Sequence, residues 1–296
     1  MKASLALLLT FGLAASLGAQ GPVKVLIAVD MEGVTGVVTA DQLGPSGFEY
    51  DRFREFMTAE ALAAVAGARA GGATEVVVVD SHGNGLNLLI DRFPDDVQII
   101  RSWPRPLGMV EGLDSSVAAV VFIGFHSGTT NPVGVRAHTM SSANYAGLTL
   151  NGQQVSESIW AAAIAGHFGV PVVAISGDNA ATAELAAVIP GIEVAVVKQA
   201  IGFHSARTLT PAAGQQLIRE RVEAGVRKRR SIRPTSPGAP VRVTLTFKSY
   251  TPGEILSYLP YFERQDAHTV AFTARDMVEA AKVLGFIGAY HAGLTP

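Results

Sequence analysis

The sequence contains no cysteine, and this absence excludes several kinds of site at once. Disulfide bonds, thiolate-bound zinc, iron–sulfur clusters and cysteine nucleophiles all require a sulfhydryl group. Any metal site or catalytic group in the chain must therefore be built from Asp, Glu, His, Ser or Lys side chains.

Charged residues are also scarce, and their signs are nearly balanced. They make up 16% of the 296 residues, against about 25% in an average soluble protein. Lys and Arg total 23 and Asp and Glu total 25, for a net charge of −2 with neutral histidines. This balance lacks the basic excess of a nucleic-acid-binding protein, so we expect no nucleic-acid partner. Hydrophobic residues reach 48%, which excludes general disorder because such a chain can bury a large core.

The first nineteen residues have the pattern of a secretory signal peptide. Met1-Lys2 is followed by an apolar stretch over 3–17 and then by the small residues Gly18 and Ala19. The stretch is shorter than the ~20 residues of a membrane-spanning helix, although an uncleaved anchor is the alternative. We predict a signal peptide over 1–19, a periplasmic or secreted location, and no membrane attachment after cleavage.

Short apolar runs alternate with helical patterns through most of the remaining chain. Five continuous, β-branched runs predict buried strands at 23–29, 75–79, 97–100, 118–124 and 170–175. Apolar residues at helical spacing predict helices at 53–70, 157–168, 180–188, 211–230 and 275–284. Two further strands are expected at 241–248 and 269–273, after a Pro/Ser/Gly-rich linker at 231–240.

This alternation predicts an α/β fold with an open, mostly parallel sheet flanked by helices. We place a metal-binding catalytic domain at residues 20–200 and a smaller α+β region at 201–296. In such sheets ligands bind in the crevice at the carboxyl ends of the strands. We therefore expect the site at that edge.

Chemically active side chains stand where four of these strands end: Asp30 and Glu32, Asp80 and His82, His126, and Asp178. A single such residue is more often a turn or helix cap. Their gathering at one sheet edge favours a site for zinc or a similar divalent ion. A carboxylate that bridges two such ions can also help to activate water.

Competing motifs are weak. His82-Gly83-Asn84-Gly85 lacks the third glycine of a dinucleotide fingerprint, since Leu88 stands in its place. The sequence has no P-loop, no G-x-S-x-G elbow and no H-E-x-x-H motif. Asp178 is expected to cap the helix after it rather than to hold an anion. Lys198, after a short strand at 193–197, is interpreted either as a site residue or as a solvated strand end. The basic cluster 227–230 suits a helix C-terminus.

The motifs at the strand ends, with several later segments, resemble the DppA-like zinc D-aminopeptidase family, a class of metallopeptidases. The segments that carry the resemblance are VDMEGVTGV (29–37), VVDSHGNGLNL (78–88), MVEGLD (109–114), GFHSG (124–128), GVRAHTM (134–140), NGQQVSES (151–158) and SGDNA (176–180). They cover most of residues 24–200, and HTVAFTARD (268–276) extends the resemblance more loosely.

The resemblance implies two zinc ions per subunit and assigns their ligands to five positions: Asp30 as the bridge, Glu32 and His82 at one ion, and His126 and Glu157 at the other. It also implies that His138 is catalytic, either as a nucleophile or as a proton-transfer group. Asp80 is then interpreted as a residue that orients a ligand histidine or a neighbouring loop.

The activity implied by the resemblance is removal of N-terminal D-amino acids, such as D-Ala, from short peptides. The family forms ring-shaped homodecamers that enclose a chamber, so we expect a homo-oligomer. Two alternatives remain at this point. One is another binuclear metallohydrolase that acts on an L-peptide, an amide or a phosphoester. The other is a non-catalytic periplasmic binding protein that uses its metal structurally.

Overall fold

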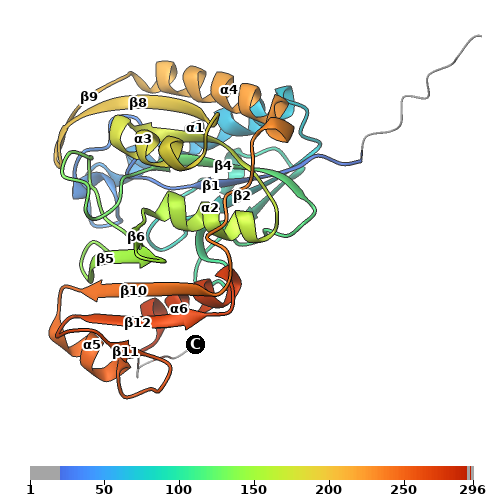
Figure 1. Ribbon diagram of the computed structural model, residues 1–296. Coiled ribbons are helices and arrows are strands. Elements are labelled where there is room, and N and C mark those ends of the chain that lie inside the picture. Colours follow the sequence, from blue (N-terminus) through green and yellow to red (C-terminus); the bar gives the residue numbers. More distant parts are fainter. Residues whose placement is uncertain (1–20, 292–293, 295–296) are drawn as a thin grey trace, which may run out of the picture.

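The computed structural model describes residues 21–291 and 294, so the predicted signal peptide lies outside the described residues. The chain forms two sheets with helices packed around them (Figure 1).

The larger sheet has seven strands in the order β3-β2-β1-β4-β7-β8-β9. Its strands are β1 (Lys24–Val29), β2 (Glu75–Asp80), β3 (Val97–Ile100), β4 (Val117–Phe125), β7 (Val172–Asp178), β8 (Glu193–Gly202) and β9 (Ser205–Thr208). All neighbouring pairs are parallel except β8 and β9, which form an antiparallel hairpin. The central strands are buried because helices cover the sheet, and this explains their continuous β-branched sequences.

Four helices accompany this sheet: α1 (Tyr50–Ala70), α2 (Glu157–His167), α3 (Asn179–Val188) and α4 (Pro211–Arg227). The helices α1 and α4 pack against each other, α1 against β1 and β4, and α4 against β7 and β8. The helix α3 packs on β7 and β8. The helix α2 lies between the two sheets and contacts β4, α3 and α6 (Figure 1).

The smaller sheet is antiparallel, in the order β11-β12-β10-β5-β6. It consists of β5 (Tyr145–Leu150), β6 (Gln153–Gln154), β10 (Val241–Phe247), β11 (Glu263–Arg264) and β12 (Thr269–Ala274), with α5 (Tyr250–Leu256) and α6 (Met277–Ala289) packed on β10 and β12. Along β10, buried residues alternate with half-buried ones, as expected of a strand with one face on the core.

Short 3-10 helices complete the described elements: η1 (Ala40–Gln42), η2 (Ile90–Arg92), η3 (Gly108–Val110) and η4 (Arg229–Ser231). Within the described residues, no helix has both the length and the apolar character needed to cross a bilayer.

The fold class predicted from the sequence is confirmed, with some elements missed. The strands β5, β6, β9 and β11 and the helix α5 were not predicted, because β5 is interrupted by glycine and the others are short. The expected boundary near residue 200 stays a prediction about folding units. Neither sheet is confined to one side of this boundary. The strands β5 and β6 precede residue 200 but belong to the smaller sheet, while β9 and α4 follow it but accompany the larger sheet.

Candidate metal centre

The predicted ligands converge at the carboxyl ends of the parallel strands. Asp30 directly follows β1, His82 comes two residues after β2, and His126 directly follows β4. Glu157 reaches the same place from the first turn of α2. All of these side chains are buried. Because β2, β1 and β4 are neighbours in the sheet, residues distant in sequence meet at one edge.

One half of the cluster consists of Asp30, Glu32 and His82. The His82 Nδ1 atom lies 3.2 Å from Asp30 Oδ1 and 3.0 Å from Glu32 Oε2. The ligand atoms of these three residues lie within 4.8 Å of one another, which is the spacing of a metal site.

The other half consists of Asp30, His126 and Glu157, so Asp30 belongs to both. The His126 Nε2 atom lies 3.3 Å from Asp30 Oδ2 and 3.4 Å from Glu157 Oε1. These three residues also offer ligand atoms within 4.8 Å of one another. Each oxygen of the Asp30 carboxylate thus faces a different histidine, which is the arrangement of a bridging carboxylate.

Backbone carbonyls orient both histidine rings. The second ring nitrogen of His82, Nε2, lies 2.7 Å from Leu43 O, and that of His126, Nδ1, lies 3.0 Å from Ser127 O. A carbonyl can only accept, so those nitrogens carry the proton. The nitrogens that face the carboxylates are therefore the ones that hold a lone pair in a neutral ring. Such second hydrogen bonds are typical of metal-ligating histidines.

The residues present fit a metal. Asp30 Oδ2 and His126 Nε2 are both buried, and neither has a hydrogen-bond partner. Leaving buried polar atoms unpartnered is costly, and a cation between them would satisfy both. The set of carboxylates and imidazoles, without thiolates, suits zinc.

The pKa values of the cluster show how strongly its carboxylates attract positive charge. Burial, with the charge of Glu32, raises the pKa of Asp30 to about 8. Burial would lower the pKa of His126, but the Glu157 carboxylate and other nearby acids raise it to about 10. A divalent cation meets the same demand for positive charge, and its binding would release protons from the cluster.

Two glycines allow the loop after β1 to approach β4 closely. The Gly33 N–H donates to Gly124 O at 2.7 Å. A Cβ atom at Gly33 would lie 2.1 Å from Phe125 O, and one at Gly124, whose φ is +70°, would lie 2.3 Å from Asp30 O. Only glycine fits at either position, and this contact brings Asp30 beside His126.

His138 lies against the His126 half of the cluster. Its ring stacks on His126, with centroids 4.0 Å apart and an interplanar angle of 9°. Its Nδ1 lies 2.9 Å from Arg136 O and therefore carries the proton of a neutral ring. The lone pair of that ring is then on Nε2, which lies 3.6 Å from Glu157 Oε1. Burial and the nearby His126 lower the pKa of His138, which favours the neutral form of its ring. His138, His126 and Glu32 also satisfy the spacing of a metal site.

Glu157 holds the loop that carries His138. Its Oε1 accepts a hydrogen bond from Met140 N at 2.6 Å. It stands at the first position of α2, after the N-cap Ser156, where a negative charge is favoured by the helix dipole. Glu157 was found only through the family resemblance, because it begins a helix and does not end a strand.

Asp80 and Asp178 lie beside the cluster and fasten loops. Asp80 accepts hydrogen bonds from the backbone and side chain of Asn87, and the Asn87 side chain donates to His82 O at 2.6 Å. Asp80 thus acts on the loop around His82 rather than on its ring. Asp178 caps α3 as expected, through Ala181 N, and its other oxygen accepts from Val135 N.

Two further residues support the site: sequence reasoning missed Glu184 and named Lys198 either as a site residue or as a solvated strand end. Glu184 on α3 accepts hydrogen bonds from Gly128 N and Asn131 Nδ2, and so fastens the loop that follows β4. Lys198 on β8 is 2% exposed, so the interpretation as a solvated strand end is wrong. Neither role leaves a sequence signal, because each depends on which loop lies opposite.

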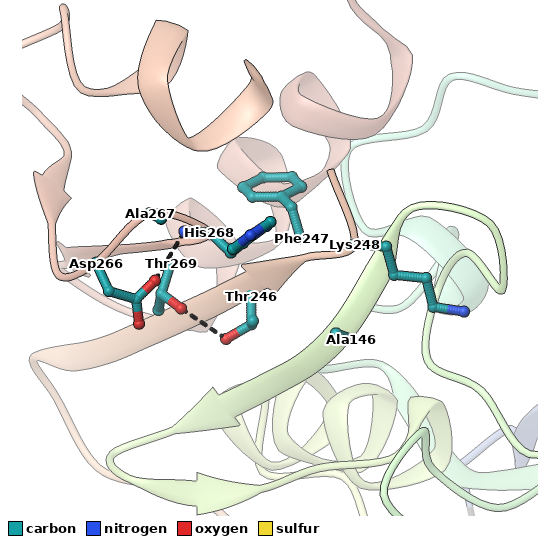
Figure 2. Close-up of a pocket in the computed structure, with 8 residues that line it drawn as sticks. All are labelled: Ala146, Thr246, Phe247, Lys248, Asp266, Ala267, His268 and Thr269. Atoms are coloured by element: carbon teal, nitrogen blue, oxygen red, sulfur yellow. Dashed lines mark hydrogen bonds between the residues drawn. The ribbon is translucent and has the colours of Figure 1, made fainter. Parts of the chain in front are cut away.

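A cavity of about 530 Å³ lies elsewhere, on the smaller sheet (Figure 2). Thr246 and Thr269, whose hydroxyl oxygens are 3.1 Å apart, line it together with Lys248 and His268. None of the cluster residues lines this cavity. The volume of this cavity therefore does not locate the candidate site, which is identified by the side chains of the cluster.

Comparisons with known proteins find D-aminopeptidases. A family model described as D-aminopeptidase matches residues 23–286. A curated D-aminopeptidase of Bacillus subtilis (strain 168) is 32% identical over 263 residues, which are 88% of this chain and 95% of that protein. A solved structure, described as the Zn-dependent D-aminopeptidase DppA from Bacillus subtilis, a self-compartmentalizing protease, superposes with a TM-score of 0.85 at 30% identity. The match covers 92% of this chain and 100% of that one.

Proposed function

Because the chain belongs to the D-aminopeptidase family, we propose that it is a zinc-dependent D-aminopeptidase that removes N-terminal D-amino acids, such as D-Ala, from short peptides. The observation that carries this proposal is the position of Asp30, whose two carboxylate oxygens face His82 and His126. The solved structure that this fold matches is described as Zn-dependent, which supports zinc as the metal.

We further propose that two zinc ions bind per chain and share the Asp30 carboxylate. Glu32 and His82 would complete the ligands of one ion, and His126 and Glu157 those of the other. Bound zinc supplies Lewis-acid chemistry, which polarises a peptide carbonyl and makes water a nucleophile near neutral pH.

The protein's own contribution to bond cleavage falls to His138. Because Arg136 O engages its Nδ1, proton exchange takes place at Nε2, the atom that faces the cluster. Burial lowers the pKa of His138 and so favours the neutral ring, whose Nε2 can take up a proton and pass it to the leaving amine. We assign His138 this proton-transfer role in preference to that of a nucleophile.

Assembly and location complete the proposal. The matched structure is described as self-compartmentalizing, which supports a closed homo-oligomer, and we propose the decamer of the family. Exposed apolar side chains on the β8–β9 hairpin, Ile201 and Phe203, suit contact between copies. Sedimentation at ten times the chain mass is the expected result, and a monomer would contradict it. We also propose export after removal of residues 1–19, which N-terminal sequencing of the mature protein tests.

The central experiment compares two substrates, D-Ala-p-nitroanilide and L-Ala-p-nitroanilide, on zinc-loaded protein. We expect hydrolysis of the D-substrate in preference to the L-substrate, and loss of the activity when a chelator removes zinc. Preference for the L-substrate would point to a different metallopeptidase. Tight zinc binding without turnover of either substrate would favour the non-catalytic binding protein.

A further inference from the structure

Lys198 is a buried cation to which the proposed chemistry gives no role. It stands on β8, where its backbone pairs with Asp178 of β7, and its side chain is 2% exposed. Its Nζ reaches the loop that follows β1 and donates three hydrogen bonds to backbone carbonyls. The acceptors are Glu32 O at 2.5 Å, Val34 O at 3.0 Å and Val37 O at 2.7 Å.

These three contacts use the full hydrogen-bonding capacity of the ammonium group, which has three donors and no acceptor. Lys198 therefore has no hydrogen left for a substrate and, as a cation, does not bind a metal. The charges of Asp178, Glu60 and Glu32 act on Lys198 and favour its charged form, but burial disfavours that form more strongly. Burial accordingly lowers the pKa of Lys198 to about 8. An apolar side chain would avoid that cost but could not gather the carbonyls.

The loop that Lys198 holds is the one that carries two predicted ligands. On one side, the loop is fixed to β4 by Asp30 N, which donates to Ile123 O, and by Gly33 N, which donates to Gly124 O. On the other side it is fixed by Lys198, which binds the carbonyl of Glu32 itself. The loop is thus held between two neighbours, and the directions of the Asp30 and Glu32 side chains depend on both.

We propose that Lys198 is a positioning residue for the metal centre: its ammonium acts as a built-in cation that gathers three carbonyls and so aims the Asp30 and Glu32 carboxylates at the metal. This inference rests on the proposed zinc site, and its test does not depend on turnover. The competing explanation is that Lys198 only fills space behind the loop.

The first test compares Lys198→Met with the control Lys228→Met. Lys228 pairs with Glu193, which begins β8 at the end of the strand opposite the cluster. We expect Lys198→Met to bind zinc about 10–100-fold more weakly, the range typical when a group that orients metal ligands is removed. Its cobalt-substituted form should show an altered d–d absorption spectrum. The control should match wild type in both measurements. Wild-type zinc affinity and spectrum in Lys198→Met would overturn the proposal.

Lys198→Arg extends this test by keeping the charge and changing its shape. A planar guanidinium cannot direct three donors at carbonyls that converge on one point. We therefore expect Lys198→Arg to show the same weakened zinc binding and altered cobalt spectrum as Lys198→Met. Full zinc affinity in Lys198→Arg would mean that charge alone suffices and that no positioning takes place.

A second experiment uses the absence of cysteine from the chain. In Lys198→Cys the new thiol is unique, so in denaturant it can be alkylated selectively with 2-bromoethylamine; the thiolate displaces bromide and forms a C–S bond. The product carries an ammonium at the same number of bonds from the backbone as lysine. Alkylation with 1-bromopropane gives a neutral chain of equal length. Wild type is carried through the same treatment and refolding as the reference.

We expect the aminoethyl side chain to restore zinc affinity and the cobalt spectrum, and the propyl side chain not to. Equal zinc binding by the two alkylated proteins would show that Lys198 only fills space. If zinc affinity follows Lys198 but wild type hydrolyses no D-peptide, the positioning role holds and the proposed substrate fails. If wild type binds no zinc, both proposals fail.

Discussion

Replacing Glu157 with Gln tests whether the His126 half of the cluster binds a zinc ion of its own. Glu157 is 5% exposed, and its Oε1 lies 3.4 Å from His126 Nε2 while accepting a hydrogen bond from Met140 N. Glutamine has nearly the same shape and can still accept from Met140 N through its amide oxygen. The substitution therefore removes a negative charge while it preserves the contact that holds the loop of His138.

The expected loss of zinc affinity follows from the burial of this carboxylate. Removing one partner of a buried charge pair costs about 3–5 kcal/mol. At about 1.4 kcal/mol for each factor of ten, zinc binding at this position should weaken by about 10²–10⁴. The Asp30–Glu32–His82 half keeps all its ligands. At a free zinc concentration that just saturates wild type, the bound zinc should fall from the proposed two ions per chain to one.

Elemental analysis of protein equilibrated in zinc buffers measures this ratio, with D-Ala-p-nitroanilide hydrolysis followed in parallel. Glu193→Gln is the matched control. Glu193 is also a largely buried carboxylate with ion-pair partners, but it begins β8, at the end of that strand away from the cluster. It should keep wild-type zinc content and rate. If Glu157→Gln retained the zinc content, affinity and rate of wild type, Glu157 would not be a ligand.

Three further predictions concern other parts of the site. His138→Ala should keep wild-type zinc content by elemental analysis while hydrolysis falls by about 10²–10⁴, the usual contribution of a general acid or base; loss of zinc would instead make His138 a ligand. The stability of Glu60→Gln relative to wild type should increase as pH rises, because burial raises the pKa of Glu60 from 4.5 to about 7. The native state therefore holds a proton that the unfolded chain has lost, and wild-type stability declines between these values by at most about 3 kcal/mol. Urea unfolding of both proteins at pH 4 and pH 8 measures the difference in their unfolding free energies, and the same difference at both pH values would refute this prediction. Gly33→Ala should lose about 1–3 kcal/mol of stability by overpacking against Phe125 O and should lose zinc affinity with it; thermal unfolding and zinc titration check both, and wild-type values would show that the loop yields easily.

Some features of this fold follow directly from local sequence. The buried strands β1, β2, β4 and β7 are continuous apolar runs, and α1 ends where Gly71 follows it, as expected. Where the pattern was short, as in β6 and α5, the sequence carried too few residues to show a period. The smaller sheet could not be assembled from sequence because its strand β5 is distant along the chain from its partner β10.

The candidate site divides in the same way. Asp30, Glu32, His82 and His126 could be selected as candidates from sequence, because each follows an apolar run that must be a buried strand. Glu157 and His138 could not, since one begins a helix and the other stands in a loop. Both required the family resemblance.

The sequence by itself determined the fold class, the exclusion of thiolate chemistry and the chemical types of the ligands, because these depend on composition and on local apolar periodicity. Only the tertiary structure decided which nitrogen of each histidine faces the carboxylates, that Asp30 stands between two histidines, and that Lys198 supports the loop of Glu32. The physical reason is that hydrogen bonds and charge pairs act over about 3 Å in space, while the residues that make them, apart from His126 and Ser127, are separated by tens to more than a hundred positions along the chain.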